Sequence, residues 1–202
     1  PNRCQFTRAS RKPVTLAARM RIAPPALVLL ALSLHPACVI DELREDEVGD
    51  AAWCDSARRW PTEPAELEDE LFAALNAVRV RSGRCGGVDQ DPAGAVQWSP
   101  ELRCAARRHA TFLAQRNATG HEGSGGSMPW QRVGFAEYEG FVMHELIARD
   151  FVDPDDVIQA WLDNPEHCRP FYRRPIEHVG IGHSRSANGD RTAWVVLTGR
   201  NR

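Results

Sequence analysis

The sequence predicts an α+β domain in which helices and a small antiparallel sheet form separate layers. Two observations support this fold class. Three segments repeat apolar residues at helical spacing, at residues 66–81, 99–113 and 153–162, and the chain ends in two β-rich runs, at residues 178–184 and 191–199. The expected order is therefore helix, helix, loop, helix, strand, strand.

The first expected helix covers residues 66–81 and is entered through Pro64. Its apolar side chains recur every three or four residues, so they share one face. They are Leu67, Leu71, Leu75 and Val78. Gly83 follows the last turn and is expected to end the helix.

The second and third expected helices begin with residues that commonly start a helix. Ser99 can cap the second helix with Pro100 at its first position, and Asp153 can cap the third with Pro154 in its first turn. The buried face of the second helix is expected to carry Leu102, Ala106, His109 and Leu113, and that of the third Val157, Ile158, Trp161 and Leu162.

The two runs at the end of the chain are "HVGIGHS" and "RTAWVVLTG". Both are rich in β-formers, and the loop between them contains Asn188-Gly189. This arrangement is typical of an antiparallel pair of strands.

Residues 1–38 have the layout of a secretory signal. They hold six basic residues and no acidic one, and the apolar run from Ile22 to Leu34 covers 13 residues, too few to span a bilayer comfortably. Met20 is a plausible start of the signal. Two alternatives stay open: cleavage before Cys38 with lipid attachment to that cysteine, as in a bacterial lipoprotein, or ordinary secretion.

Residues 39–65 are expected to form an acidic tether and entry segment before the domain of residues 66–202. The tether prediction rests on the stretch from Asp41 to Asp50, which is acidic and poor in apolar residues. Without residues 1–38 the chain has 19 basic and 27 acidic residues, a formal net charge of −8. Such a surface gives no electrostatic basis for binding nucleic acid.

Four cysteines follow Cys38 in the sequence, at positions 54, 85, 104 and 168. An even number in an exported chain indicates two disulfides, and none of them forms a Cys-x-x-Cys motif. Three pairings stay open on the sequence alone.

Three residues are candidates for metal binding or proton transfer. They are His121 in "TGHEGSGGSMPWQR", Glu145 in "MHELIA" and His167 in "NPEHC". Imidazoles and a carboxylate are the usual donors for zinc. The plainer interpretation is that each histidine lies at the surface and that Glu145 points to solvent from a strand edge, because separations along the chain say nothing about proximity in space.

The order of six motifs resembles that of a bacterial CAP domain, the family also called SCP-like extracellular proteins. The motifs are "LNAVRVRSGRCGG", "WSPELRCAARRHATFLA", "HEGSGGSMPWQR", "HELIA", "WLDNPEHCR" and "HVGIG". The resemblance covers residues 66–199. It implies a three-layer α-β-α sandwich, in which a central antiparallel sheet lies between helical layers and a broad cleft holds a His/Glu cluster.

On the matching positions, the resemblance implies that His121, Glu145 and His167 line the cleft. It also favours disulfides joining Cys85 to Cys168 and Cys54 to Cys104. The sequence departs from the family's pattern at several points. His144 and Leu146 flank Glu145 where the family has Gly and Asn, and Asp163-Asn164 stands where animal members carry a second cleft glutamate.

Three functions stay open. In the first, a secreted or lipid-anchored protein of the cell envelope binds a lipid, a peptide or another envelope component without turnover, and Trp130, Phe135 and Tyr138 form the apolar rim of its cleft. In the second, the protein is a structural component of the envelope. Either would be extracellular, in the periplasm, at the outer membrane or at the cell surface.

The third function is that of a peptidase-like hydrolase that depends on zinc or another divalent cation. His121 and His167 would bind the ion, and Glu145 would act as the general base on bound water. The sequence has no His-Glu-x-x-His motif.

Overall fold

The computed structural model describes residues 43–202, which belong to one compact unit. The expected signal segment, Met20 and Cys38 lie outside the described residues. The larger helices are α2 (Thr62–Arg79), α3 (Pro100–Arg116), α4 (Pro129–Phe135) and α5 (Pro154–Asp163). The short ones are η1 (Ala52–Cys54), α1 (Asp55–Arg58), η2 (Ser124–Gly126), α6 (Pro165–Cys168) and η3 (Arg169–Tyr172). Within the described residues, no helix is both long and apolar enough to cross a membrane.

The main sheet has the strand order β5-β7-β8-β6. Its strands are β5 (Gln97–Trp98), β6 (Phe141–Arg149), β7 (His178–Arg185) and β8 (Thr192–Arg200). The three long strands are antiparallel, and the short β5 runs parallel to β7. Two small antiparallel pairs lie outside this sheet, formed by β1 (Leu43–Glu45) with β2 (Arg59–Pro61) and by β3 (Gly83–Cys85) with β4 (Val88–Gln90).

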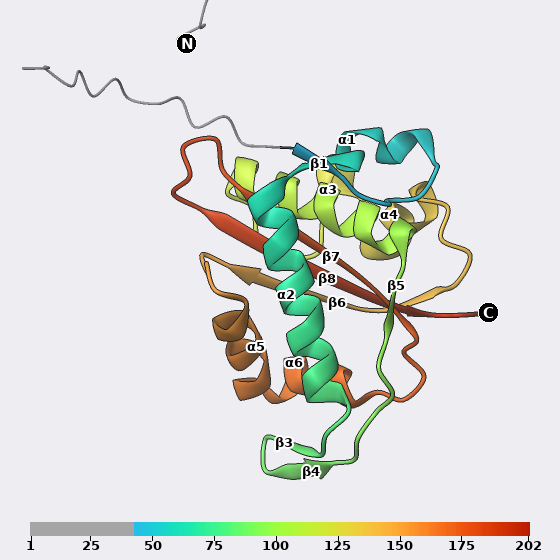
Figure 1. Cartoon of the computed structure of the whole chain (residues 1–202), viewed down its shortest axis with the longest axis vertical. Coiled ribbons are helices and arrows are strands. Elements are labelled where there is room, and N and C mark those ends of the chain that lie inside the picture. Colours follow the sequence, from blue (N-terminus) through green and yellow to red (C-terminus); the bar gives the residue numbers. More distant parts are fainter. Residues whose placement is uncertain (1–42) are drawn as a thin grey trace, which may run out of the picture. The chain divides into compact units, whose positions relative to one another are not determined.

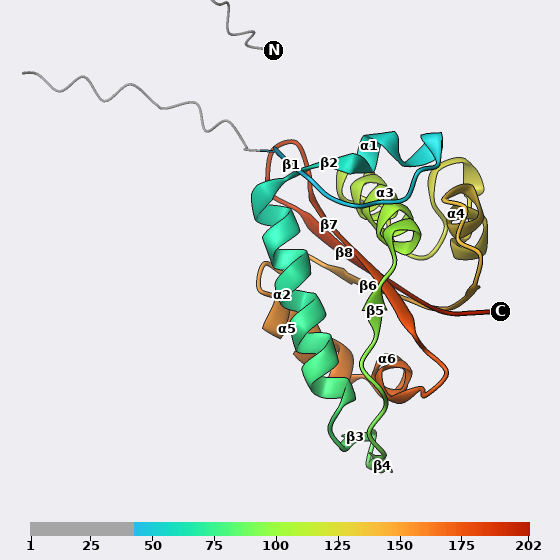
Figure 2. The same cartoon turned by 45° about the vertical axis from the view of Figure 1, so that its right-hand side comes forward.

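Helices cover both faces of the sheet, as expected for an α-β-α sandwich (Figures 1 and 2). On one face, α3 packs against β7 and β8, with α1 and α4 beside it. On the other face lie α2 and α5, whose buried side chains meet those of β6, β7 and β8. The fold class predicted from the sequence is therefore confirmed.

Helix α3 lies directly on β7 because two glycines of "HVGIG" have no side chain. A Cβ added to Gly180 would stand 2.0 Å from the carbonyl carbon of Leu102, and one added to Gly182 would stand 2.3 Å from the amide nitrogen of Arg107. The neighbouring residues Val179 and Ile181 point to the opposite face, into the core under α2.

The predicted helix starts agree with the structure for α3 and α5. The Ser99 side chain accepts a hydrogen bond from the amide of Leu102, and that of Asp153 accepts one from the amide of Asp155. Helix α2 begins at Thr62 rather than at residue 66, because Pro64 fits the first turn of a helix and does not have to precede it.

Strand β6 (Phe141–Arg149) is absent from the order expected from the sequence, which has a loop there. This strand has helices on both sides. Its side chains Leu146 and Ala148 enter the core under α2, while Ile147 packs against the core under α3. Because both faces are covered, the strand lacks the alternation of apolar and polar residues that would have identified it.

The prediction of a solvated acidic tether is wrong for the described part of that stretch. Val48 is fully buried, and Asp46 Oδ2 lies 2.7 Å from Arg107 Nη2. Arg107 also binds Glu68 on α2, with 2.6 Å between its Nη2 and Glu68 Oε2. The charge pattern alone could not show that an acidic residue of this stretch neutralises a buried arginine on α3.

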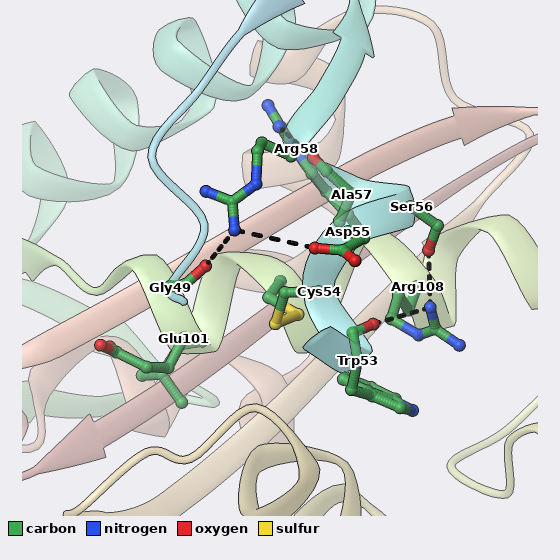
Figure 3. Close-up of a disulfide and its surroundings, with 12 residues drawn as sticks. Gly49, Trp53, Cys54, Asp55, Ser56, Ala57, Arg58, Glu101 and Arg108 are labelled. Atoms are coloured by element: carbon green, nitrogen blue, oxygen red, sulfur yellow. Dashed lines mark hydrogen bonds and ion pairs between the residues drawn. A yellow bond between two sulfur atoms is a disulfide. The ribbon is translucent and has the colours of Figure 1, made fainter. Parts of the chain in front are cut away.

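Both expected disulfides are present. They join Cys54 to Cys104 and Cys85 to Cys168, the pairing that the resemblance implies. The first fastens the N-terminal segment to α3 (Figure 3). The second fastens α6 to β3, which follows α2.

Candidate functional site

Glu145 lies in the middle of β6 on the face covered by α3. Since Leu146 and Ala148 point to the other face, alternation along the strand directs Glu145 toward α3 and α4. Its side chain is only 1% exposed. Glu145 is therefore buried and does not point to solvent from a strand edge.

Both oxygens of the Glu145 carboxylate have partners. His121 Nδ1 lies 2.8 Å from Oε1, and Arg132 Nη2 lies 2.6 Å from Oε2. A buried carboxylate needs such donors, because removing an ionised group from water is costly unless it is paired and hydrogen-bonded. The structure thus brings together His121 and Glu145, which the sequence analysis singled out, and adds Arg132.

Arg132 also holds the loop that carries His121. From α4, its Nη1 donates to the carbonyl oxygen of His121 at 3.0 Å and to that of Ser127. The loop between them turns through Gly125 and Gly126, which both have positive φ. One guanidinium therefore fixes both ends of the glycine loop and the carboxylate behind it.

His109 on α3 is a second imidazole near the carboxylate. Its Nε2 lies 3.8 Å from Glu145 Oε1 and 3.2 Å from the carbonyl oxygen of Gly120. Burial lowers the pKa of His109 to about 3, and the positive charge of Arg132 acts in the same direction. His109 is therefore neutral at ordinary pH, and its Nε2–H is the donor to Gly120.

His121 is the exposed member of the group, with 54% of its side chain accessible. A carboxylate can only accept a hydrogen bond, so the contact with Glu145 requires a proton on His121 Nδ1. In the neutral ring, Nε2 then carries the lone pair. The arrangement presents one imidazole of fixed tautomer at the surface.

His167 is on a different element from His121 and Glu145. It belongs to α6, which Asn164 caps and which packs against α5, η3 and β3. Among the described residues, no hydrogen bond or ion pair joins His167 to His121 or Glu145. Both cartoon views show α6 and α4 in different parts of the molecule (Figures 1 and 2).

The described residues do not fit a zinc site. Within residues 43–202, no group of three or more His, Cys, Asp or Glu side chains is placed to hold a metal ion. A carboxylate behind an imidazole does occur behind zinc ligands. Among the described residues, only His121 is hydrogen-bonded to such a carboxylate, and structural or catalytic zinc needs at least three protein ligands.

The aromatic residues expected at the cleft rim differ in exposure. Trp130 is 59% and Phe135 49% exposed. Tyr138 is partly buried, and its hydroxyl lies 2.9 Å from His178 Nδ1. Burial raises the pKa of Tyr138 to about 12, and the charges of nearby carboxylates add to this effect.

Sequence reasoning did not identify Arg132 or His109 as members of the site. Arg132 follows the glycine loop in "SMPWQR". Its closeness to that loop is the only feature of the sequence that points to a role in the site. His109 appeared as one residue on the buried face of a helix. Its neighbours Gly120 and Glu145 come from segments that the sequence cannot place against that helix.

Comparisons with known proteins agree with this fold. The family model described as CAP, the cysteine-rich secretory protein family, matches residues 72–198. A search of curated proteins found no match to the sequence.

Two solved structures share the fold. An outer surface protein from Borrelia burgdorferi is 18% identical, with a TM-score of 0.56, and the alignment covers 68% of this chain and 94% of that one. An extracellular protein containing an SCP domain from Bacillus anthracis is 15% identical, with a TM-score of 0.56 and coverage of 68% of this chain and 41% of that one. A third structure, NaASP2 with Zn²⁺, is 13% identical over 70% of this chain and 81% of that one. Its TM-score of 0.45 is too low to support a metal site here.

Proposed function

The chain belongs to the CAP, or cysteine-rich secretory protein, family, and from that premise we propose that it is an exported binding protein whose ligand contacts the imidazole of His121 and is not turned over. CAP proteins are typically extracellular, and two disulfides suit an oxidising compartment. The proposal includes two fates for the exported chain. Either it stays attached to the envelope through Cys38, or it is released.

The proposal rests on the fact that both carboxylate oxygens of Glu145 already have hydrogen-bond partners. Its carboxylate is buried and shared between His121 and Arg132, at 2.8 and 2.6 Å. A general base must reach the water that it activates, and this carboxylate has both oxygens engaged and almost no accessible surface. It orients His121 instead, so that the ring is preorganised as a hydrogen-bonding group.

The ligand class in this proposal is a lipid, a peptide or a cell-wall component. The exposed side chain of Trp130 on α4, the helix that carries Arg132, would add apolar contact surface. A few oriented polar groups beside aromatic surface are common in small-ligand sites.

The test is a binding assay with three probes: purified peptidoglycan, phosphatidylglycerol vesicles and a short peptide library. The wild-type domain is compared with His121→Ala and with His167→Ala, a matched substitution outside the His121–Glu145 pair. We expect one probe to bind, about fivefold weaker binding for His121→Ala, the worth of one hydrogen bond of about 1 kcal/mol, and unchanged binding for His167→Ala.

Chromatography of the same peptidoglycan and peptides with added zinc distinguishes the other functions. We expect no new products. Zinc-stimulated cleavage that both histidine variants abolish would establish the hydrolase in place of the binding protein. Failure of all three probes to bind would favour a structural role.

A further inference from the structure

A polar cavity of about 350 Å³ lies along one face of α3, beside α1, β2 and η2. The helix residues that line it recur at the three- and four-residue spacing of a single helix face. They are Arg108, Thr111, Phe112, Gln115 and Arg116, and Ser56, Trp60 and Ser124 complete the lining. None of these residues is acidic, so the cavity carries two positive charges.

The two arginines of the cavity differ from a neighbouring arginine of α3. Arg107 pairs with Glu68 at 2.6 Å, whereas within residues 43–202 neither Arg108 nor Arg116 forms an ion pair. Burial lowers the pKa of Arg108, and no described carboxylate offsets this effect. A partly buried cation without a counter-ion is unfavourable, so an anion at this place would stabilise it.

The Arg108 guanidinium is held in place before any ligand arrives. Its Nη1 donates to the carbonyl oxygen of Trp53 at 2.9 Å and to Ser56 Oγ at 2.5 Å, and the group lies 4.2 Å from the centre of the Trp53 ring (Figure 3). The next residue, Cys54, is bonded to Cys104 of α3. These fixed contacts reduce the ordering cost of binding.

One edge of this guanidinium is open. Nε and Nη2 of Arg108 have no hydrogen-bond partner among the described residues, and neither is one of the buried atoms that lack a partner. Both nitrogens are therefore accessible to solvent. The N–H bonds along this Nε–Nη2 edge are parallel, so they can bind two oxygens of one carboxylate or phosphate group.

Nearby hydroxyl groups favour a phosphate over a carboxylate. Ser56 Oγ accepts from Arg108 and keeps its O–H as a donor, and the exposed side chain of Ser124 has no partner among the described residues. Thr111 donates to the carbonyl oxygen of Arg107 at 2.9 Å, so its hydroxyl is already engaged. The guanidinium edge alone engages both oxygens of a carboxylate, whereas a phosphate monoester has a further oxygen for the hydroxyls.

We propose that this cavity binds a phosphate monoester, with two oxygens on the Nε–Nη2 edge of Arg108 and the third on the hydroxyls of Ser56 and Ser124. Arg116, about two helical turns further along α3, adds a second positive charge. Two sources supply this group, a soluble phosphate ester and the headgroup of a phospholipid. The inference goes beyond the ligand proposed for His121, which does not line this cavity.

The experiment is a titration of the ¹⁵N-labelled domain with sodium phosphate at pH 7 and constant ionic strength, followed by amide chemical shifts. We expect a dissociation constant on the order of 1 mM, as suits an ion of five heavy atoms. Shifts should concentrate in α1, η2 and the second half of α3. Acetate, with only two oxygens, should bind at least about fivefold more weakly, and equal binding would overturn the phosphate assignment.

Matched variants separate the cavity from the general effect of charge. Arg108→Gln should weaken phosphate binding at least about tenfold, whereas Arg81→Gln, at an exposed arginine outside the cavity, should not. Equal losses in these two variants would refute the site. Arg108→Lys keeps the charge without the parallel N–H bonds and should bind with intermediate strength, so full wild-type affinity would refute the two-oxygen contact.

A further variant keeps the test decisive if unfolding temperatures show that Arg108→Gln is not folded. Ser124→Ala removes an exposed hydroxyl without touching Arg108, and it should weaken phosphate binding by about fivefold. His121→Ala should leave phosphate binding unchanged, because His121 belongs to the other site. Unchanged affinity in Ser124→Ala together with a loss in His121→Ala would contradict the proposal.

A second arm distinguishes the two sources of the phosphate. Glycerol 3-phosphate is titrated in the same way, and phosphatidic acid vesicles, which display the same headgroup, are tested by sedimentation. The chain beyond residue 38 has 19 basic and 27 acidic residues, so anionic vesicles repel it overall and binding requires a local site.

Sedimentation with these vesicles that Arg108→Gln abolishes would assign the site to a phospholipid headgroup. Binding of glycerol 3-phosphate without sedimentation would assign it to a soluble phosphate ester. Failure of phosphate, glycerol 3-phosphate and the vesicles to bind would refute the proposal, even if His121 binds its own ligand.

Discussion

Lowering the pH should destabilise the protein through two buried histidines, His183 and His109. His183 is fully buried and stacks on Trp194 with ring centroids 4.0 Å apart, and neither of its ring nitrogens has a partner among the described residues. Burial lowers the pKa of His183 to about 3, with a further contribution from the charge of Arg185. His109 has a similarly lowered pKa of about 3, again chiefly through burial.

The sign follows from comparing the folded and unfolded chains. An unfolded histidine takes up a proton as the pH falls through about 6.5, but these two folded residues stay neutral until about pH 3. The unfolded state therefore binds more protons in this window, and stability falls with pH. Each ring contributes up to about 1.4 kcal/mol per pH unit, and half of that at pH 6.5, where the unfolded ring is half protonated, so that two rings cost about 3 kcal/mol between pH 6.5 and 5.

His183→Phe isolates one of the two contributions. Phenylalanine keeps the stack on Trp194 and removes two buried nitrogens that lack partners, so we expect stability at pH 7 equal to or above that of the wild type. Between pH 6.5 and 5 the variant should lose about 1.6 kcal/mol where the wild type loses about 3 kcal/mol.

The assay is urea unfolding followed by far-ultraviolet circular dichroism at pH 7, 6.5, 6, 5.5 and 5. Partly buried His144 has a pKa lowered by burial and by Arg173, and it adds a contribution of the same sign to both proteins. The comparison therefore depends on the difference between the two pH profiles. A wild-type stability that stays constant down to pH 5, or equal losses in the two proteins, would refute the reasoning.

Three further predictions concern packing and covalent or ionic links. Gly182→Ala should destabilise the domain by at least about 2 kcal/mol in urea unfolding, because the new Cβ would meet the backbone of α3. Gly134→Ala, which has open space around it, should be neutral or stabilising. Equal effects of the two substitutions would contradict the close contact between β7 and α3. Replacing Cys54 and Cys104 by serine should cost about 4 kcal/mol, because the bridge closes a 50-residue separation, and an unchanged unfolding midpoint would contradict this estimate. Arg107→Met should cost about 3 kcal/mol, because it removes the closer of the two arginines that neutralise buried Glu68 and leaves only Arg103 at 3.3 Å; a loss below about 1 kcal/mol would contradict a buried ion pair.

The layered fold could be predicted because its main signals are local. A cap such as Ser99 acts on an amide three residues away, and the apolar spacing of α2 and α5 is visible in a window of one helix. Strand β6 escaped prediction because it is covered on both faces, and its sequence therefore shows no period of two.

The site was only partly predictable because its contacts link distant segments. The resemblance to CAP domains pointed to His121 and Glu145, which are 24 residues apart and in direct contact. It gave no reason to add His109, whose role depends on the placement of α3. Asp46 shows the same limit, since its partner Arg107 is 61 residues away.

The protonation of the His121 ring tests the central claim most directly. Long-range ¹H–¹⁵N NMR of the wild-type domain reports which ring nitrogen carries the proton in the neutral form. If Glu145 orients His121 for ligand binding, the proton is on Nδ1 and Nε2 is the free acceptor. A neutral ring with its proton on Nε2 would contradict the hydrogen bond to Glu145 and, with it, the binding site proposed around His121.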